Sequence, residues 1–397
     1  MKNKFLSRII SLLFFAILLQ TAYAQNTSGE FSFIVSSDQR DHATEKYRSH
    51  EYTMGGYEAI KKFGKGSFMV VLGDLDPPQA TNELIDKVLG KDYNRYFVIG
   101  NHDIENPSNI EYLRQLNRGE NSYPNIARKG PAGCEETTYS FDWGPAHFIV
   151  LNVYYDGKTD TGIDGNITPE LLQWLENDLK MNSKKHVFIF GHEPLFPVLD
   201  MDTGTVRHEG DALDKYPAST LRYLQLLQKY KVTAYLSGHV HCASYSSVNG
   251  IWLLNSGHLY GQEGNYTAEK LFSHMTKEIG KEKEDGLGRT EAVANFFRSE
   301  NKEMKKFIFN LGFGDGINYK NLTDEQTLEH LTEFYIECTK GRSELEKYSD
   351  LFWKNTEWRP STFLKIKINE KEGFLEIYRD KDYTGNYVLR HTQILYK

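Results

Sequence analysis

Short hydrophobic runs recur along the first two thirds of the chain and have the β-branched and aromatic content of buried strands. The predicted strands are Phe31–Ser36, Phe68–Leu72, Tyr96–Ile99, Thr138–Phe141, His147–Val153, His186–Phe190, Val232–Leu236 and Ile251–Leu254. Helical patterns lie between many of these strands. Strands that alternate with helices predict an α/β architecture.

Two helices are predicted from their own signals. Thr168 is a favourable cap, and Pro169 follows it in the first helical turn. The apolar residues of this helix, which share one face, are Leu171, Leu172, Leu175 and Leu179. A second helix is expected from about Ala218 to Lys229.

The pattern changes after about Tyr260. Residues 265–355 are strongly charged and mostly helical in spacing, which predicts a helical insertion or cap over residues 263–355. Residues 356–397 return to strand patterning and are expected to pack on the core as a β segment. Its strands would be Phe363–Ile368, Phe374–Tyr378 and Tyr387–Tyr396, with a turn at Thr384-Gly385. The core itself would span residues 25–262.

The first 24 residues have the pattern of a cleaved export signal. Basic residues precede the apolar run Ile9–Leu19, and Ala22-Tyr23-Ala24 fits the small-x-small cleavage rule. The run is short for a membrane span. We therefore expect an exported protein, periplasmic or extracellular, without a stable membrane anchor; an uncleaved anchor is the alternative.

The balance of charges limits the class of partner. The formal net charge is −7, and removing the basic leader makes it more negative. Broad nucleic-acid binding is driven by positive charge, so no nucleic-acid partner is expected. A small anionic substrate stays compatible, because a bound metal ion overrides net charge locally. With only three cysteines, such a metal would need His and oxygen ligands.

Polar residues follow five of the predicted strands, in most cases directly after a glycine. The five blocks are Ser37-Asp38, Gly73-Asp74, Gly100-Asn101-His102-Asp103, Gly191-His192-Glu193-Pro194 and Gly238-His239-Val240-His241. In open α/β sheets, ligands bind beyond the carboxyl ends of the strands. Glycine lets the backbone turn sharply and approach a bound ion.

These residue types suit one kind of chemistry. Carboxylate, amide oxygen and neutral imidazole are ligands for Mn, Fe or Zn ions. Two ions about 3.5–4 Å apart can hold a phosphate, activate a water and stabilise the leaving oxygen. A nearby His that binds no metal can donate a proton to the leaving group. The strand ends therefore indicate a metal-dependent phosphoesterase acting on a small phosphorylated substrate.

The five blocks, in this order and each after a strand, resemble the calcineurin-like metallophosphoesterase superfamily over roughly residues 31–258. The resemblance implies a four-layer α/β/β/α sandwich with a dinuclear site for two divalent or trivalent metal ions. The implied metal ligands are Asp38, Asp74, Asn101, His192, His239 and His241. Asp74 would bridge the two ions, and a bridging hydroxide would attack phosphorus in line.

The same resemblance implies catalytic roles beside the ligands and reveals one departure. His102 would contact the phosphate or protonate the leaving group, and Asp103 would orient it. The family has Asp-x-His in its first block, where the His is a ligand, but this chain has Asp38-Gln39-Arg40. Arginine stays protonated and has no lone pair, so Arg40 cannot replace that His.

Three interpretations of the departure follow. Water, Gln39, His42 or Asp76 could complete the first metal site. Arg40 could bind a substrate phosphate through its planar guanidinium, or form a structural salt bridge.

The leading hypothesis is a secreted hydrolase of phosphomonoesters or phosphodiesters. The alternative is a catalytically impaired secreted binding protein on the same fold, because Arg40 removes a ligand.

Overall fold

The computed structural model describes residues 30–40, 49–196, 198–199, 206–207, 211–259, 361–380 and 386–397. The predicted export signal, the predicted helical insertion, His42 and the Thr384-Gly385 turn lie outside these residues.

The first sheet has six strands in the order β15-β14-β13-β1-β2-β3. Its parallel strands are β1 (Phe31–Ser36), β2 (Phe68–Val71) and β3 (Asn94–Phe97). The helices α2 (Ser49–Phe63) and α3 (Pro78–Leu89) lie between these strands in the chain. Three antiparallel strands extend the sheet beyond β1: β13 (Thr362–Ile368), β14 (Gly373–Asp380) and β15 (Tyr387–Tyr396).

The second sheet has seven strands in the order β11-β12-β10-β7-β6-β5-β4. Its central parallel strands are β6 (Ala146–Val150), β7 (His186–Phe190), β10 (Ala234–Ser237) and β12 (Ile251–Ser256). The antiparallel strands toward its edges are β4 (Ile126–Lys129), β5 (Tyr139–Trp143) and β11 (Ala243–Val248). The helices α6 (Pro169–Met181) and α7 (Pro217–Lys229) connect β6 to β7 and β7 to β10.

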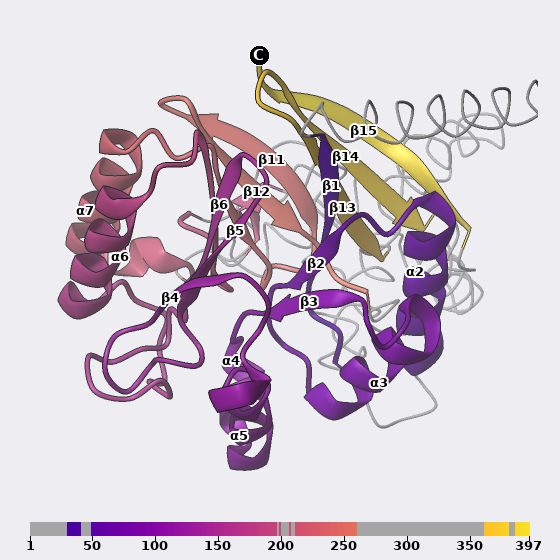
Figure 1. Cartoon of the computed structure of the whole chain (residues 1–397), viewed down its shortest axis with the longest axis horizontal. Coiled ribbons are helices and arrows are strands. Elements are labelled where there is room, and N and C mark those ends of the chain that lie inside the picture. Colours follow the sequence, from indigo (N-terminus) through magenta and orange to yellow (C-terminus); the bar gives the residue numbers. More distant parts are fainter. Residues whose placement is uncertain are drawn as a thin grey trace, which may run out of the picture.

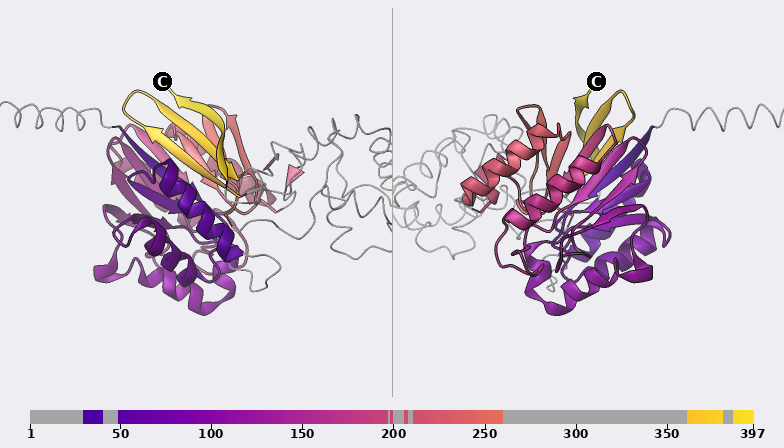
Figure 2. Two further views of the ribbon diagram at one scale, coloured as in Figure 1. Left: turned by 90° about the vertical axis from the view of Figure 1, so that its right-hand side faces the viewer. Right: turned by 60° about the vertical axis from the view of Figure 1, so that its left-hand side comes forward.

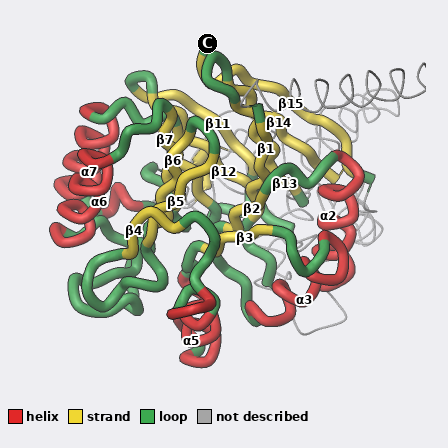
Figure 3. Tube along the Cα trace, in the orientation of Figure 1, coloured by secondary structure: helices red, strands yellow, loops and turns green. Residues whose placement is uncertain are grey.

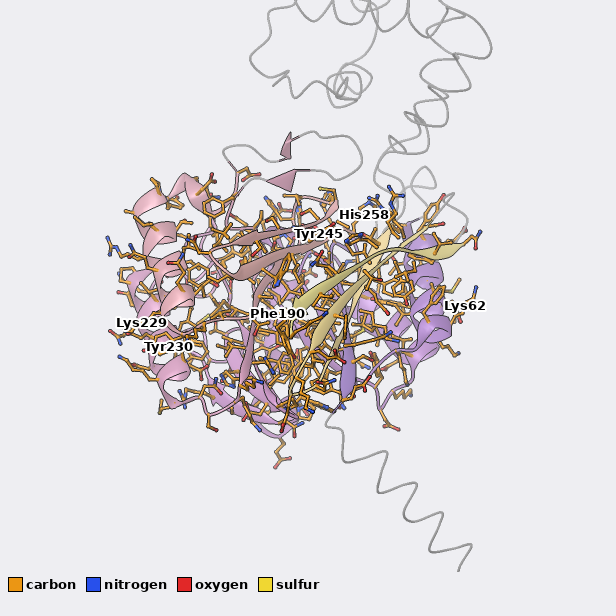
Figure 4. The ribbon with its side chains drawn as sticks, turned by 90° about the horizontal axis from the view of Figure 1, so that it is seen from above. Lys62, Phe190, Lys229, Tyr230, Tyr245 and His258 are labelled. Carbon is orange, nitrogen blue, oxygen red and sulfur yellow. The ribbon has the colours of Figure 1, made fainter. Side chains whose placement is uncertain are left out.

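The two sheets pack face to face, with helices on both outer faces (Figures 1 and 2). Alternate side chains of each strand enter two different cores, as the two-residue period of a strand requires. Phe33 and Phe68 pack between the sheets, whereas Ile34 and Met69 pack beneath the helices. In Figure 4, Phe190 lies at the centre of the molecule. The predicted four-layer α/β/β/α sandwich is confirmed.

The predicted strands are all present with small shifts at their ends, and two strands of the large sheets, β4 and β11, were not predicted. Both form edges of the second sheet (Figure 3). They carry charged or hydroxyl side chains, as edge strands commonly do, and so lack the hydrophobic run that identifies a buried strand. The start of α6 is as predicted, since Thr168 accepts a hydrogen bond from Leu171 N at 3.3 Å.

Three short elements complete the part of the sandwich near the strand ends. They are α4 (Asn101–Glu105), α5 (Pro107–Gln115) and the 3₁₀ turn η2 (Leu213–Lys215). A further 3₁₀ turn, η1 (Gly119–Asn121), and a two-stranded ribbon of β8 (Val198–Leu199) and β9 (Val206–Arg207) lie in the loops. None of the helices in the described ranges has the length and hydrophobicity to cross a bilayer.

Phe148 should be a large contributor to stability. Its buried ring stacks on Phe141 and Phe188 and meets Phe33 and Phe68 edge-on, with ring centroids 5.0 to 5.5 Å apart. Phe148→Ala should lower the free energy of unfolding by about 3–5 kcal/mol, measured by urea denaturation. Leu221→Ala, at an exposed position of α7, should stay within about 0.5 kcal/mol of the unmodified protein. Equal effects from the two changes would contradict this account of the core.

Candidate metal centre

The ends of β1, β2 and β7 bring three predicted ligands together from both sheets. Asp38, Asp74 and His192 each offer a ligand atom, and these atoms lie within 4.8 Å of one another. All three residues are buried. Since they come from separate sequence blocks, the packing of the sheets creates the cluster.

The backbone is unusual at four of the six predicted ligands. Asp38, Asp74, His239 and His241 have φ angles of 53°, 57°, 68° and 55°. Only seven non-glycine residues in the described ranges have a positive φ. This left-handed conformation is disfavoured for residues with a side chain, and it collects at functional sites when surrounding contacts enforce it. Here backbone hydrogen bonds from Asp38 N to Gly73 O (3.0 Å) and from Gln39 N to Asp74 O (2.8 Å) hold the turns.

Two of the glycines predicted to permit close approach do so. A Cβ atom at Gly100 would clash with the carboxylate and backbone of Asp74. A Cβ atom at Gly238 would clash with the side chains of Ser37 and Asp38. Neighbouring strand ends can therefore meet only where a side chain is missing.

His192 is held in the orientation of a metal ligand. Its Nδ1 lies 2.6 Å from the carbonyl oxygen of Leu72, which can only accept, so Nδ1 carries the proton. In the neutral ring the lone pair is then on Nε2. That atom lies 3.1 Å from Asn101 Oδ1 and 3.5 Å from Asp74 Oδ1. Fixing one ring nitrogen so that the other faces the ion is the usual arrangement around a metal-bound His.

The electrostatics of the cluster favour negative carboxylates beside positive charge. Burial opposes ionisation of Asp74, but His192 and His102 outweigh it and hold its pKa well below the usual range. For Asp38, His241 similarly outweighs the effect of burial and lowers the pKa. Burial disfavours the charged form of His192, yet Asp74 and Asp38 raise the pKa of its imidazole to about 10. The carboxylates therefore attract cations strongly.

Asp38 has one satisfied and one unsatisfied oxygen. Its Oδ2 accepts from the Ser37 hydroxyl and from His239 N, the latter at 3.0 Å. Its Oδ1 is buried, lies 3.1 Å from Nε2 of His241 and accepts no hydrogen bond. A buried carboxylate oxygen of this kind normally has a partner. The donor set and this oxygen fit a metal ion.

Two of the residues considered as replacements for the missing His are engaged elsewhere. The amide of Gln39 donates to Ser36 Oγ at 2.6 Å and accepts from the hydroxyl of Tyr57. Asp76 Oδ1 accepts from Asn109 Nδ2 at 2.8 Å. Arg40 differs from both, because its Nε is buried without a hydrogen-bond partner in the described part of the chain.

His102 lies at the rim of the cluster, but Asp103 does not orient its ring. The His102 side chain is 24% exposed, and its Nε2 lies 3.8 Å from Asp74 Oδ2. Glu105, not Asp103, lies beside the imidazole, with Oε1 2.8 Å from Nδ1. Sequence reasoning did not single out Glu105, although its spacing of three residues on α4 places both side chains on one face.

Asp103 instead binds the backbone of the strand ends. Its oxygens accept from Asp74 N (2.9 Å), Leu75 N (2.9 Å) and Gly100 N (2.8 Å). Burial and the neighbouring Asp74 raise the pKa of this carboxyl to about 7. The structure thus places Asp103 as a brace between two loops, which differs from the predicted catalytic role.

The side chains of the Gly238-His239-Val240-His241 block contact further residues. His239 Nε2 lies 3.2 Å from Asp211 Oδ2, and the rings of His239 and His192 are 5.2 Å apart. His241 lies 5.9 Å, ring to ring, from His258, which is buried and labelled in Figure 4. Sequence reasoning did not select Asp211, because one Asp in a polar loop carries no pattern.

Comparison with known proteins identifies a family. The sequence model of the calcineurin-like phosphoesterases matches residues 45–243. No curated protein matches this sequence. Among solved structures, GAP50, described as the anchor in the inner membrane complex of Plasmodium, is 13% identical with a TM-score of 0.46; the match covers 92% of this chain and 89% of that one.

Two further structures are similar to a comparable degree. Purple acid phosphatase PPD1 from yellow lupin (Lupinus luteus) is 13% identical with a TM-score of 0.47, over 93% of this chain and 54% of that one. PhoD is 11% identical with a TM-score of 0.47, over 92% of this chain and 69% of that one.

Asp103→Asn tests the role of Asp103 as a brace. An amide would turn its NH₂ toward a backbone N–H, which should lower the free energy of unfolding of the metal-free protein by about 1–3 kcal/mol. Chemical denaturation in the presence of a chelator measures this effect. Asp92→Asn, at an exposed turn, is the matched control. If Asp103→Asn left stability unchanged and only altered turnover, the catalytic interpretation would be restored.

Proposed function

Because the chain belongs to the calcineurin-like phosphoesterase family, we propose that it hydrolyses small phosphomonoesters or phosphodiesters with two bound metal ions. The observation that carries the proposal is the convergence of Asp38, Asp74 and His192 at the ends of strands from both sheets. The proposed ions are Mn, Fe or Zn, since the donors are carboxylate, amide oxygen and imidazole.

The six predicted ligands divide between two sites. Asp74 is proposed to bridge the ions. Asn101 and His192 would join His239 at one ion, and Asp38 and His241 would bind the other. The 3.1 Å separation of His192 Nε2 and Asn101 Oδ1 supports the first group, and the 3.1 Å separation of His241 Nε2 and Asp38 Oδ1 supports the second.

Two bound ions would supply positive charge for the phosphate oxygens and acidify a water molecule. The protein's own contribution to bond cleavage is proposed to come from His102. Glu105 Oε1 lies 2.8 Å from Nδ1 and orients the imidazole, so that an Nε2–H can donate to the leaving oxygen. The partial exposure of His102 leaves it accessible to a substrate.

Arg40 is proposed to bind the substrate phosphate. Its guanidinium is a permanent cation two residues from Asp38, and its Nε has no protein acceptor among the described residues. Arginine donates to phosphate in a bidentate geometry. In this proposal Arg40 neutralises part of the negative charge of the substrate phosphate. A first metal ion with its full set of ligands would otherwise neutralise that charge.

We also propose export to the periplasm or the extracellular space, on the basis of the N-terminal pattern alone. Mass spectrometry of the mature protein from a suitable host should find a cleavage after Ala24. An intact N-terminus in the recovered protein would argue against it.

Metal quantification combined with a phosphate-release screen tests the main proposal. The purified protein should contain close to two transition-metal ions per chain and should hydrolyse aryl phosphate monoesters or diesters. Asp74→Asn should reduce both metal content and turnover. A catalytically impaired binding protein, the alternative that Arg40 favours, would instead contain one ion or none and show no turnover in excess metal.

His102→Ala tests the role of His102 as a proton donor. Loss of a general acid typically costs about 10²–10⁴-fold in kcat. The loss should be large for alkyl phosphates and much smaller for 4-nitrophenyl phosphate, whose leaving group needs no proton. His186→Ala, at the opposite end of β7 from the site, is the control. An equal loss for both substrates would exclude proton donation by His102.

Arg40→Ala should leave metal content unchanged and lower kcat/KM by about 10- to 100-fold, because a charge-assisted hydrogen bond to phosphate is lost. Steady-state kinetics and elemental analysis measure the two quantities. Arg40→His provides the decisive comparison. A gain in activity with added metal would show that the chain lacks a ligand, whereas a loss supports phosphate binding by Arg40.

A further inference from the structure

Three carboxylates converge on one ammonium group beside the metal centre. Lys215, at the end of η2, places its Nζ 3.0 Å from Asp164 Oδ1, 3.3 Å from Glu193 Oε2 and 3.9 Å from Asp211 Oδ1. The Lys215 side chain is only 16% exposed. Burial disfavours its charge, but Glu193 and Asp164 outweigh this effect and raise the pKa of the ammonium.

Two of these carboxylates, those of Asp211 and Glu193, belong to residues adjacent to predicted metal ligands. Asp211 uses one oxygen toward Lys215 and the other toward His239, whose Nε2 lies 3.2 Å from Oδ2. Glu193 follows His192 in the chain and is 2% exposed. Lys215 therefore lies between the loops that carry the two imidazoles.

The contact with Asp211 bears on which nitrogen of His239 faces the ion. A carboxylate only accepts, so the nitrogen beside it carries the proton. In the neutral ring of His239 the lone pair is then on Nδ1. His192 has the opposite arrangement, since its Nδ1 donates to Leu72 and its lone pair is on Nε2. A carboxylate behind a ligating His fixes the ring and strengthens metal binding.

The contact with Glu193 fixes the other loop. Glu193 Oε1 accepts from Gly165 N at 3.1 Å, and its backbone carbonyl accepts from the Tyr235 hydroxyl at 2.6 Å. A Cβ atom at Gly165 would clash with the Glu193 carboxylate. A buried carboxylate that loses its cation is strongly destabilised. Without Lys215, Glu193 would lose its positively charged partner, and Glu193 belongs to the segment that positions His192.

We propose that Lys215 is a positioning residue for the metal ion held by Asn101, His192 and His239. It acts on His239 through Asp211 and on the His192 loop through Glu193. The inference rests on the proposed function, because it assumes that this ion binds.

Lys215→Met tests the inference by metal affinity, measured for the full-length protein by competition with a chromogenic chelator for Zn. The substitution keeps the length of the side chain and removes the charge. Affinity for one of two ions should fall by about 10- to 100-fold, as for other residues that support ligands. Lys215→Arg retains the cation and should retain most of the affinity.

Lys229→Met is the matched control. Lys229 lies on the outer side of α7 (Figure 4) and pairs with Glu176 at 2.7 Å, so its loss should leave metal affinity unchanged. Asp211→Ala should weaken the same ion as Lys215→Met. In the double variant that carries Lys215→Met and Asp211→Ala, the loss of metal affinity should be smaller than the product of the two single fold-changes. The reason is that both substitutions act through one contact.

The outcomes separate this inference from the proposed function. If the unmodified protein binds two ions while Lys215→Met binds both with unchanged affinity, the inference fails and the proposed function stands. A lower Tm of metal-free Lys215→Met with unchanged affinity also overturns it, because that is a purely structural role. If the unmodified protein binds no metal, the proposed function fails and the inference fails with it.

Discussion

Asp38 and Asp74 place two negative charges where neither side chain is more than 1% exposed to solvent. Buried charges of the same sign are costly unless cations and hydrogen-bond donors compensate them. Backbone N–H groups of His239 and His102 donate to the two carboxylates, and imidazoles approach the other oxygens, Asp38 Oδ1 and Asp74 Oδ2. The left-handed turns and the glycines at the strand ends follow from this requirement. Only such turns and glycines let polar groups from both sheets reach one point.

The hydrophobic pattern was sufficient to predict the α/β class and most of the strands, whereas the four-layer sandwich was implied by the family resemblance. Strands such as Phe31–Ser36 and His186–Phe190 are buried on both faces, so their composition is distinctive, and their boundaries were predicted without error. The edge strands β4 and β11 were missed because one face or one edge meets solvent and polar residues are tolerated there. The candidate ligands Asp38, Asp74 and His192 lie close together, as the sequence predicted, because each follows the end of a strand within a few residues.

The residues that orient the ligands were beyond sequence reasoning. The Leu72 carbonyl, which holds His192, has no side-chain signature. Asp211 and Lys215 belong to a polar loop and a short turn, and that turn meets the Glu193 segment through a backbone hydrogen bond from Leu213 N to Pro194 O and through Lys215 itself. For Asp103, the position next to His102 in the sequence suggested a contact that the helical turn prevents, since side chains of adjacent helical residues diverge.

The β13 strand has a consequence for how the protein is made. It pairs with β1, the strand that leads to Asp38, and Lys365 on β13 donates to the carbonyl of Phe63, 302 residues earlier in the chain. During synthesis from the N-terminus, β1 therefore has an unpaired edge until residues 362–368 have emerged. Contacts between such distant segments also slow folding. A nascent chain would thus keep this edge open to proteases or chaperones for most of its synthesis.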